Sequence, residues 1–210
     1  MTELTVFQQK ISAFCSEIEL RFNESMAKHT SFRIGGDAEV MAFPKNGEEL
    51  AELLKTSALL DTKFAILGAG TNVLAPDEGM SGLVICLKDC LAGMERLDET
   101  HIRVMAGITM ARAAVFAAGL GLSGMEFAHG IPGTVGGGVY MNAGAYGGEL
   151  CQIIEHVQVM DYDGHVHRLT CEEMGFSYRH SRLEEENGIV LRVDFVLTPG
   201  NEDEIRGKMK

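Results

Sequence analysis

The residues best suited to chemistry in this sequence are the glycines gathered between positions 119 and 149. This stretch of 31 residues holds 11 of the 25 glycines in the chain. Glycine is costly to order, so a dense cluster in a folded region indicates a backbone that turns sharply or approaches a ligand closely. Its N–H groups can then face phosphate or carbonyl oxygens. Apolar residues such as Met125, Val135 and Val139 interrupt the glycines, which favours a packed loop over a flexible linker. A buried turn that binds nothing is the alternative.

Two shorter segments could form loops that hold phosphate groups. Gly68-Ala-Gly-Thr-Asn72 follows an apolar strand, and Gly130-Ile-Pro-Gly-Thr-Val-Gly-Gly137 lies inside the glycine-rich stretch. Together they suit a ligand with a diphosphate and a long body better than a ligand with a single phosphate. For the first loop, a simple turn with Asn72 in a left-handed conformation is an equal alternative.

The common nucleotide-binding fingerprints do not apply. Gly119-Leu-Gly-Leu-Ser-Gly124 fits the letters G-x-G-x-x-G, but it follows a helix and runs toward Pro132. The dinucleotide fingerprint follows a strand and opens a helix, so we reject that interpretation. The chain has no Gly-Lys-Ser/Thr triplet and therefore no Walker A motif.

Tyr178-Arg-His-Ser181 is a candidate for anion recognition outside the glycine loops. The planar guanidinium of Arg179 suits a carboxylate or a phosphate. In so acidic a chain, Arg179 could equally pair with a surface carboxylate such as Glu184. His129, inside the glycine stretch, could contact a ligand or serve as a hydrogen-bonded structural histidine.

His165 and His167 lie two residues apart and therefore share one face of an expected strand. A metal site would need more ligands nearby. We expect an exposed hairpin strand and no metal centre.

Charge and composition narrow the classes of partner. The 210 residues carry a formal net charge of −12, with 46% hydrophobic and 23% charged residues. Such a chain repels nucleic acid and anionic membranes, so we expect neither as a partner. No signal peptide or membrane-spanning run is expected. Five cysteines without a C-x-x-C pair are interpreted as reduced thiols of a cytoplasmic protein.

The first half of the chain predicts a small α/β unit that positions the first glycine loop. Apolar spacing predicts a helix over residues 4–20 and a second helix from Asn46 to about residue 60, with Glu49 completing a capping box. Strands are expected at 38–43, 64–67 and 83–87, with the glycine turn after the second of them.

The second half predicts an antiparallel α+β unit around the long glycine stretch. Strands are expected at 101–105 and 189–197, and Asp163-Gly164 predicts a hairpin of 157–161 with 165–169. Thr109 should cap a helix over 110–118, and Thr170 with Glu173 should open a short helix. Residues 201–210 are typical of the start of a linker or helix.

Taken together, four segments resemble one family, the UDP-N-acetylenolpyruvoylglucosamine reductases, which are flavoenzymes of peptidoglycan precursor synthesis. The segments are HTSFRIGG (29–36), LGAGTNVL (67–74), GLSGMEFAHGIPGTVGGGVYMNAGAYGGE (121–149) and YRHS (178–181), in the order of the family. The resemblance implies an α+β, two-lobed FAD-binding fold of the vanillyl-alcohol oxidase type. It assigns residues 1–88 to an N-terminal FAD-binding lobe, 89–200 to a second FAD-binding lobe, and 201–210 to the start of a connection to a C-terminal substrate domain.

The resemblance also implies the cofactors, substrate and site residues. FAD and NADPH would be the cofactors, and a UDP-sugar carrying an enolpyruvyl group would be the substrate. Arg179 would be the catalytic residue, and Tyr178 and Arg179 would bind the substrate. The cofactor-binding residues carried over from the family are Gly68, Ala69, Gly70, Thr71, Asn72, Val73, Gly130, Ile131, Pro132, Gly133, Thr134, Val135, Gly136, Asn142, Ala143 and Gly144.

The sequence departs from the family in one large respect. No segment here matches the family's C-terminal substrate domain, which holds a proton-donating serine and a distal glutamate. We therefore expect the flavin-binding part of the enzyme, with activity only when that domain is supplied. The alternatives are a non-catalytic FAD-binding remnant and another oxidase of the same FAD superfamily. The sequence does not predict an oligomeric state.

Overall fold

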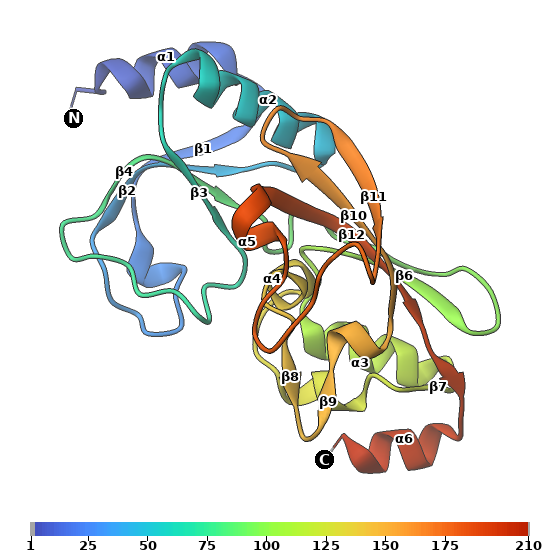
Figure 1. Cartoon of the computed structure of the whole chain (residues 1–210). Helices are drawn as coiled ribbons and strands as arrows, with labels where there is room; N and C mark the ends of the chain where they lie inside the picture. Colours follow the sequence, from blue (N-terminus) through green and yellow to red (C-terminus); the bar gives the residue numbers. More distant parts are fainter. Residues whose placement is uncertain (1–2, 210) are drawn as a thin grey trace. The chain divides into compact units, whose positions relative to one another are not determined.

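The computed structural model describes residues 3–209 and divides the chain into two compact units (Figure 1). Unit 1 comprises Met1–Cys90 with Tyr162–Gly164, and unit 2 comprises Leu91–Asp161 with His165–Lys210. Each unit has its own sheet, and the glycine-rich stretch lies entirely in unit 2.

Unit 1 is built on a four-stranded sheet in the order β1-β2-β4-β3. β1 (Glu19–Ser25) pairs antiparallel with β2 (Asp37–Phe43), whereas β4 (Met80–Cys86) runs parallel to both β2 and β3 (Phe64–Leu67). The helices are α1 (Val6–Phe14), α2 (Gly47–Leu59) and the short 3-10 helix η1 (Met26–Lys28). The predicted strand–helix–strand order and the glycine turn after β3 are therefore confirmed.

The predicted helix over residues 4–20 is wrong in its second half. A capping box of Thr5 with Gln8 opens α1, but the helix ends at Phe14, and Cys15 is its C-cap. Ile18 is buried at helical spacing, which misled the sequence interpretation. From Glu19 the chain is a strand, because pairing with β2 satisfies its backbone along the edge of the sheet.

Helix α2 has the predicted N-cap in a modified form. The Asn46 side chain accepts a hydrogen bond from the Glu49 N–H at 2.9 Å. The Glu49 carboxylate accepts from the N–H of Lys45 at 2.7 Å, one residue earlier than a standard capping box requires.

Unit 2 is built on a wholly antiparallel five-stranded sheet in the order β11-β10-β12-β6-β5. Its strands are β5 (Met94–Arg96), β6 (His101–Met105), β10 (Ile154–Asp161), β11 (Val166–Thr170) and β12 (Gly188–Val196). The hairpin predicted at Asp163-Gly164 joins β10 to β11, with Gly164 at φ 88°. The antiparallel α+β prediction for this half is confirmed.

The glycine-rich stretch is not one loop, as the sequence suggested. It contains β7 (Leu122–Ser123), the 3-10 helix η2 (Glu126–Gly130), helix α4 (Val135–Tyr140), and the hairpin of β8 (Gly144–Ala145) with β9 (Gly148–Glu149). Helix α4 forms despite its three glycines because Thr134 caps it and its glycines permit close packing. A Cβ at Gly136 would lie 2.9 Å from the Cβ of Ala106, and one at Gly138 would lie 3.0 Å from the sulfur of Met110.

The remaining elements of unit 2 flank this stretch. Helix α3 (Met110–Gly119) begins at the predicted cap, Thr109. The 3-10 helix η3 (Leu150–Gln152) follows β9, and α5 (Leu183–Glu186) precedes β12. Strand β13 (Thr198–Pro199) pairs with β7. Residues 201–210 were expected to start a linker or helix, and they contain helix α6 (Glu202–Lys208), whose Ile205 is buried.

The short helix predicted at Thr170 is absent. Thr170 and Glu173 make the expected reciprocal hydrogen bonds, but residues 171–175 form turns that reach the left-handed Gly175 at φ 57°. None of the helices within residues 3–209 is long and apolar enough to cross a membrane.

Candidate functional site

In unit 1, the first glycine loop borders a pocket of about 360 Å³. Gly68 and Ala69 line it together with Lys28, Arg33 and Lys88. Three cationic side chains at one pocket are a local exception in a chain of net charge −12. These three residues are not predicted as site residues from the sequence, although Arg33 lies in the HTSFRIGG segment; basic residues next to a glycine loop are the available signal.

The shape of this loop depends on Gly70. Its φ is 63°, and a Cβ there would lie 2.0 Å from the carbonyl oxygen of His29. The N–H of Ser31 donates to the carbonyl of Gly70 at 3.0 Å, so the loops at 29–36 and 68–75 are packed together. Gly70 is the left-handed residue of this turn, and the alternative of a left-handed Asn72 is wrong.

The other predicted residues of the first loop have different surroundings. Val73 packs against the buried cluster around Met26 and Leu67, so its side chain anchors the loop to the core of unit 1. Thr71 and Asn72 both have polar or electrostatic partners within the chain.

Glu24 holds the basic side of the pocket in place. Its carboxylate lies 2.9 Å from Nε2 of His29 and 3.4 Å from Nζ of Lys28. The hydrogen bond from His29 is the main cause of a lowered Glu24 pKa, with a further contribution from Lys28. Glu24 therefore stays ionised and can fix both neighbours.

In unit 2, the predicted second loop, residues 130–136, leads into the N-terminus of α4. The N–H groups of Ile131, Val135 and Gly136 donate to the carbonyls of Ala128, Ile108 and Ala106 respectively. Pro132 has no N–H. Gly133 sits at φ 131°, and its carbonyl accepts from Met110 N–H at 3.0 Å. Three of the six N–H donors of this loop are thus used within unit 2.

The C-terminus of α4 is closed by Asn142. Its N–H donates to the carbonyl of Val139 at 3.1 Å, and the next N–H, of Ala143, donates to that of Gly138 at 2.8 Å. With Asn142 at φ 43°, this is a Schellman motif in which asparagine takes the position usually occupied by glycine.

Asn142 is 2% exposed, and its side-chain amide is hydrogen-bonded at both the nitrogen and the oxygen. Its Nδ2 donates to Glu149 Oε2 at 2.9 Å and to the carbonyl of Ser177 at 3.0 Å. Its Oδ1 accepts from the N–H of Cys151 at 3.0 Å. Asn142 thereby joins the β8–β9 hairpin to the segment that carries the YRHS motif.

That motif forms a tight turn closed by two backbone hydrogen bonds between Ser177 and His180. At its tip, Tyr178 is 87% exposed and Arg179 is left-handed at φ 55°. Nη2 of Arg179 donates to the carbonyl of Gly144 at 2.7 Å. Ser181, wholly buried, donates from Oγ to the carbonyl of Tyr140, the last residue of α4, at 2.6 Å.

Unit 2 therefore brings together Asn142, Gly144, Tyr178 and Arg179 around the end of α4. The alternative pairing of Arg179 with Glu184 is wrong, because Glu184 accepts from Nδ1 of His180 at 2.9 Å. Within residues 3–209, Arg179 has no carboxylate partner, and its one hydrogen bond leaves other guanidinium donors for a ligand.

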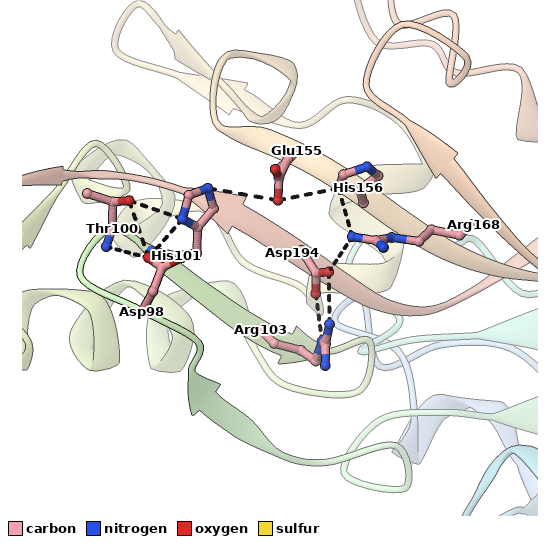
Figure 2. Close-up of polar contacts among 8 residues, drawn as sticks. All are labelled: Asp98, Thr100, His101, Arg103, Glu155, His156, Arg168 and Asp194. Carbon is pink, nitrogen blue, oxygen red and sulfur yellow. Dashed lines mark hydrogen bonds and ion pairs between the residues drawn. The ribbon is translucent and has the colours of Figure 1, made fainter.

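The sequence interpretation did not foresee an ion-pair network on the sheet of unit 2 (Figure 2). Asp194, 5% exposed, accepts two hydrogen bonds from Arg103 at 2.7 and 3.0 Å. Burial raises the pKa of Asp194, but the hydrogen bonds and charge of Arg103 outweigh it and the net pKa is lowered. Figure 2 also shows Glu155 between His101 and His156. All charges here have partners, so the network is structural.

His165 and His167 both lie beside Asp161, with contacts of 3.3 and 2.8 Å. Their side chains are 73% and 52% exposed. The prediction of an exposed hairpin strand is confirmed for His167, whereas His165 lies one residue before β11.

Comparisons with known proteins agree with these features. Residues 38–170 match the family model of the FAD binding domain. A UDP-N-acetylenolpyruvoylglucosamine reductase of Caldanaerobacter subterraneus subsp. tengcongensis is 41% identical over 210 residues, covering 100% of this chain and 68% of the relative. The first curated relatives are longer than this chain, which spans 64% to 68% of their length.

Solved structures show the same relationship. The UDP-N-acetylenolpyruvylglucosamine reductase of Thermus caldophilus has a TM-score of 0.75 and 34% identity, over 91% of this chain and 66% of the other. An FAD-containing glucooligosaccharide oxidase of Acremonium strictum has a TM-score of 0.65 and 16% identity, over 90% of this chain and 42% of the other. At this low identity the likeness shows a shared fold alone.

These matches confirm the predicted fold class, the α+β FAD-binding fold of the vanillyl-alcohol oxidase type. The FAD-binding match, the identity over the whole chain and the shared fold together place this protein in the UDP-N-acetylenolpyruvoylglucosamine reductase family.

Proposed function

We propose that this chain is the flavin-binding part of an NADPH-consuming enzyme. That enzyme reduces the enolpyruvyl group of UDP-N-acetylglucosamine enolpyruvate to give UDP-N-acetylmuramate in peptidoglycan precursor synthesis. One observation supports this choice within the family fold. Arg179 is held on a turn at the end of α4 with no carboxylate partner in residues 3–209, which suits a residue that must meet an anionic substrate.

The residues of unit 1 fit an FAD diphosphate. A Cβ at Gly70 would collide with the carbonyl of His29, so glycine lets this loop fold tightly. Lys28, Arg33 and Lys88 place positive charge at a pocket lined by Gly68 and Ala69. Residues 68–73, 130–136 and 142–144 stay our proposed cofactor contacts, Asn142 through its backbone alone. Bound FAD would accept hydride from NADPH and pass it to the substrate; the protein supplies position and charge.

Arg179 is the proposed catalytic residue. Hydride addition to the enolpyruvyl methylene carbon leaves negative charge on the neighbouring carbon and the carboxylate. A fixed guanidinium that contacts this carboxylate stabilises the developing charge, and one such donor contributes roughly 3–4 kcal/mol elsewhere. Tyr178 is exposed at the same turn, and we propose that it lines the substrate pocket.

The reaction also needs a proton at the carbon beside the new C–H bond. The resemblance assigns this step to a serine in a C-terminal segment that the four matching segments do not include. We therefore assign residues 1–88 and 89–200 to flavin binding and 201–210 to the approach to that segment. The enzyme is placed in the cytoplasm, where the UDP-sugar and NADPH are found.

The deciding experiment is an FAD titration of the purified chain, followed by visible absorption. We expect saturation near one FAD per chain and a shifted flavin spectrum. A chain that is folded by circular dichroism yet binds no FAD would contradict the proposal. An unfolded chain would be retested after fusion to the C-terminal segment of the Caldanaerobacter relative.

Turnover separates the proposal from its two alternatives. In the fusion protein, NADPH oxidation that depends on the enolpyruvyl substrate supports the reductase. FAD binding without turnover indicates a non-catalytic flavin module. Hydrogen peroxide formed from a sugar or alcohol indicates an oxidase of the same superfamily.

A further inference from the structure

Asn142 occupies a backbone position that would favour glycine. Its φ is 43°, and the neighbouring stretch uses glycine at other left-handed positions, including Gly133 and Gly147. Asparagine tolerates this conformation less well than glycine but brings a side-chain amide. The identity of the residue is therefore explained by what the amide contacts.

The amide contacts leave no donor for a ligand. Both Nδ2 hydrogens are donated, one to Glu149 and one to the carbonyl of Ser177, and Oδ1 accepts from Cys151. With the residue 2% exposed, a cofactor could contact this side chain only after these hydrogen bonds were broken.

The contact with Ser177 matters because Ser177 begins the turn that presents Arg179. The turn is attached to the region around α4 at three points. These are the Asn142 amide on the Ser177 carbonyl, the Arg179 guanidinium on the Gly144 carbonyl, and the Ser181 hydroxyl on the Tyr140 carbonyl. Only the Asn142 contact comes from a side chain outside the turn segment.

We propose that Asn142 is a positioning residue. Its side chain holds the Ser177–His180 turn, and through it the Arg179 guanidinium, and does not contact the cofactor. The catalytic meaning of this role rests on the proposed function, in which Arg179 acts on the substrate. The role of Asn142 in placing the turn does not depend on that function.

Two substitutions separate the contacts. Asn142→Gly keeps the left-handed backbone and removes all three side-chain hydrogen bonds. Asn142→Asp has almost the same shape and keeps the acceptor for Cys151, but it loses both donors and sets a carboxylate against Glu149 and the Ser177 carbonyl. Asn187→Gly is the matched control, because Asn187 is exposed and also left-handed, at φ 54°.

The readout is NMR of the ¹⁵N-labelled 210-residue chain. In Asn142→Gly we expect the amides of Cys151, Ser177 and His180 to exchange about tenfold faster. In Asn142→Asp, Ser177 and His180 should exchange faster while Cys151 stays protected. The Nε–H signal of Arg179 should move in both variants, and Asn187→Gly should change none of these.

Unchanged Ser177 and His180 exchange in both Asn142 variants would overturn the proposal. FAD titrations of the same proteins add an independent test. We expect parental affinity in Asn142→Gly, and a loss of affinity without faster exchange would make the side chain a cofactor ligand. If the parent itself binds no FAD, the proposed function fails, while the exchange data still decide the role of Asn142.

Discussion

At the scale of single residues, the candidate site of unit 2 is notable for backbone conformations that side chains rarely adopt. Asn142, Tyr146 and Arg179 all have positive φ, from 43° to 55°. A left-handed L-residue costs about 1–2 kcal/mol. Such residues persist only where surrounding contacts fix them, and they concentrate at functional sites. Arg179 meets this condition through its turn and its hydrogen bond to Gly144.

Arg179→Ala should leave FAD binding unchanged and slow reoxidation of the reduced flavin by substrate about 100-fold or more, because a fixed cation is lost from the developing charge. Stopped-flow absorbance of the fusion protein with the Caldanaerobacter segment measures both quantities. Arg96→Ala is the control, since the hydrogen bonds of Arg96 go to backbone carbonyls in the loop between β5 and β6. Normal reoxidation in Arg179→Ala would remove this residue from the mechanism.

Gly70→Ala should destabilise unit 1 and weaken FAD binding. The new Cβ would lie 2.0 Å from the His29 carbonyl, so the loop must move in addition to bearing the left-handed strain. We expect a loss of at least about 2 kcal/mol in unfolding free energy. Gly147→Ala is the matched control, because Gly147 also has a positive φ, of 83°, but a Cβ there would meet nothing within 4 Å. This variant should lose only about 1 kcal/mol of unfolding free energy. Equal urea midpoints for the two variants would show that the His29 clash is relieved.

At the scale of elements, helix α4 organises unit 2. Its N-terminal amides pair with the backbone after β6, and its C-terminal carbonyls meet Ala143, Asn142 and Ser181. A helix leaves its last carbonyls without intrahelical partners, so a side chain that satisfies one also fixes the segment that carries that side chain. The position of the YRHS turn thus depends on how α4 ends.

Ser181→Ala should destabilise the protein by about 1–3 kcal/mol, because it removes the hydrogen bond from the buried Ser181 hydroxyl to the Tyr140 carbonyl. Chemical unfolding measures this loss. Thr198→Ala removes a comparable hydroxyl-to-carbonyl contact, 3.3 Å long and exposed, and should cost much less. A Ser181 variant as stable as the parent would mean that water replaces the hydroxyl.

The elements also show what could be inferred from the sequence. Local signals succeeded: Thr109 caps α3, and Asp163-Gly164 turns the β10–β11 hairpin. Helix α4 was missed because its glycines have low helix propensity, and only packing against Ala106 and Met110 explains them. Arg179 was found by resemblance. The three contacts that hold its turn join residues 35 to 41 positions apart, a separation that no local pattern reports.

At the scale of the whole molecule, charged residues are unevenly distributed. The net charge is −12, yet the pocket of unit 1 gathers three cations and the sheet of unit 2 buries Asp194 against Arg103. The lowered pKa of Asp194 means that its ion pair stabilises the fold above the ordinary carboxyl pKa of 3.8. That contribution is lost as pH falls through the lower, folded-state pKa.

Asp194→Asn should therefore cost about 1.5–3 kcal/mol at pH 7, because the partly buried Arg103 loses its buried anionic partner and keeps only the exposed carboxylate of Glu95. The difference between variant and parent should shrink below about pH 4, where the unfolded parent carboxyl gains its proton. Urea unfolding at pH 7 and pH 3 measures the two differences. If the difference in unfolding free energy between variant and parent does not change with pH, the charge of Asp194 does not contribute to stability.

The five thiols give the molecule a practical property. Burial raises the pKa of each of them, that of Cys90 to about 11, so roughly one Cys90 in a thousand is a thiolate at pH 8. Alkylating dyes react with the thiolate and should label the native chain slowly. A new cysteine at the exposed Tyr178 position would react far sooner. A fluorophore can thus be attached beside Arg179 without first removing the native cysteines, and a change in its emission on adding the UDP-sugar would test the proposed substrate site.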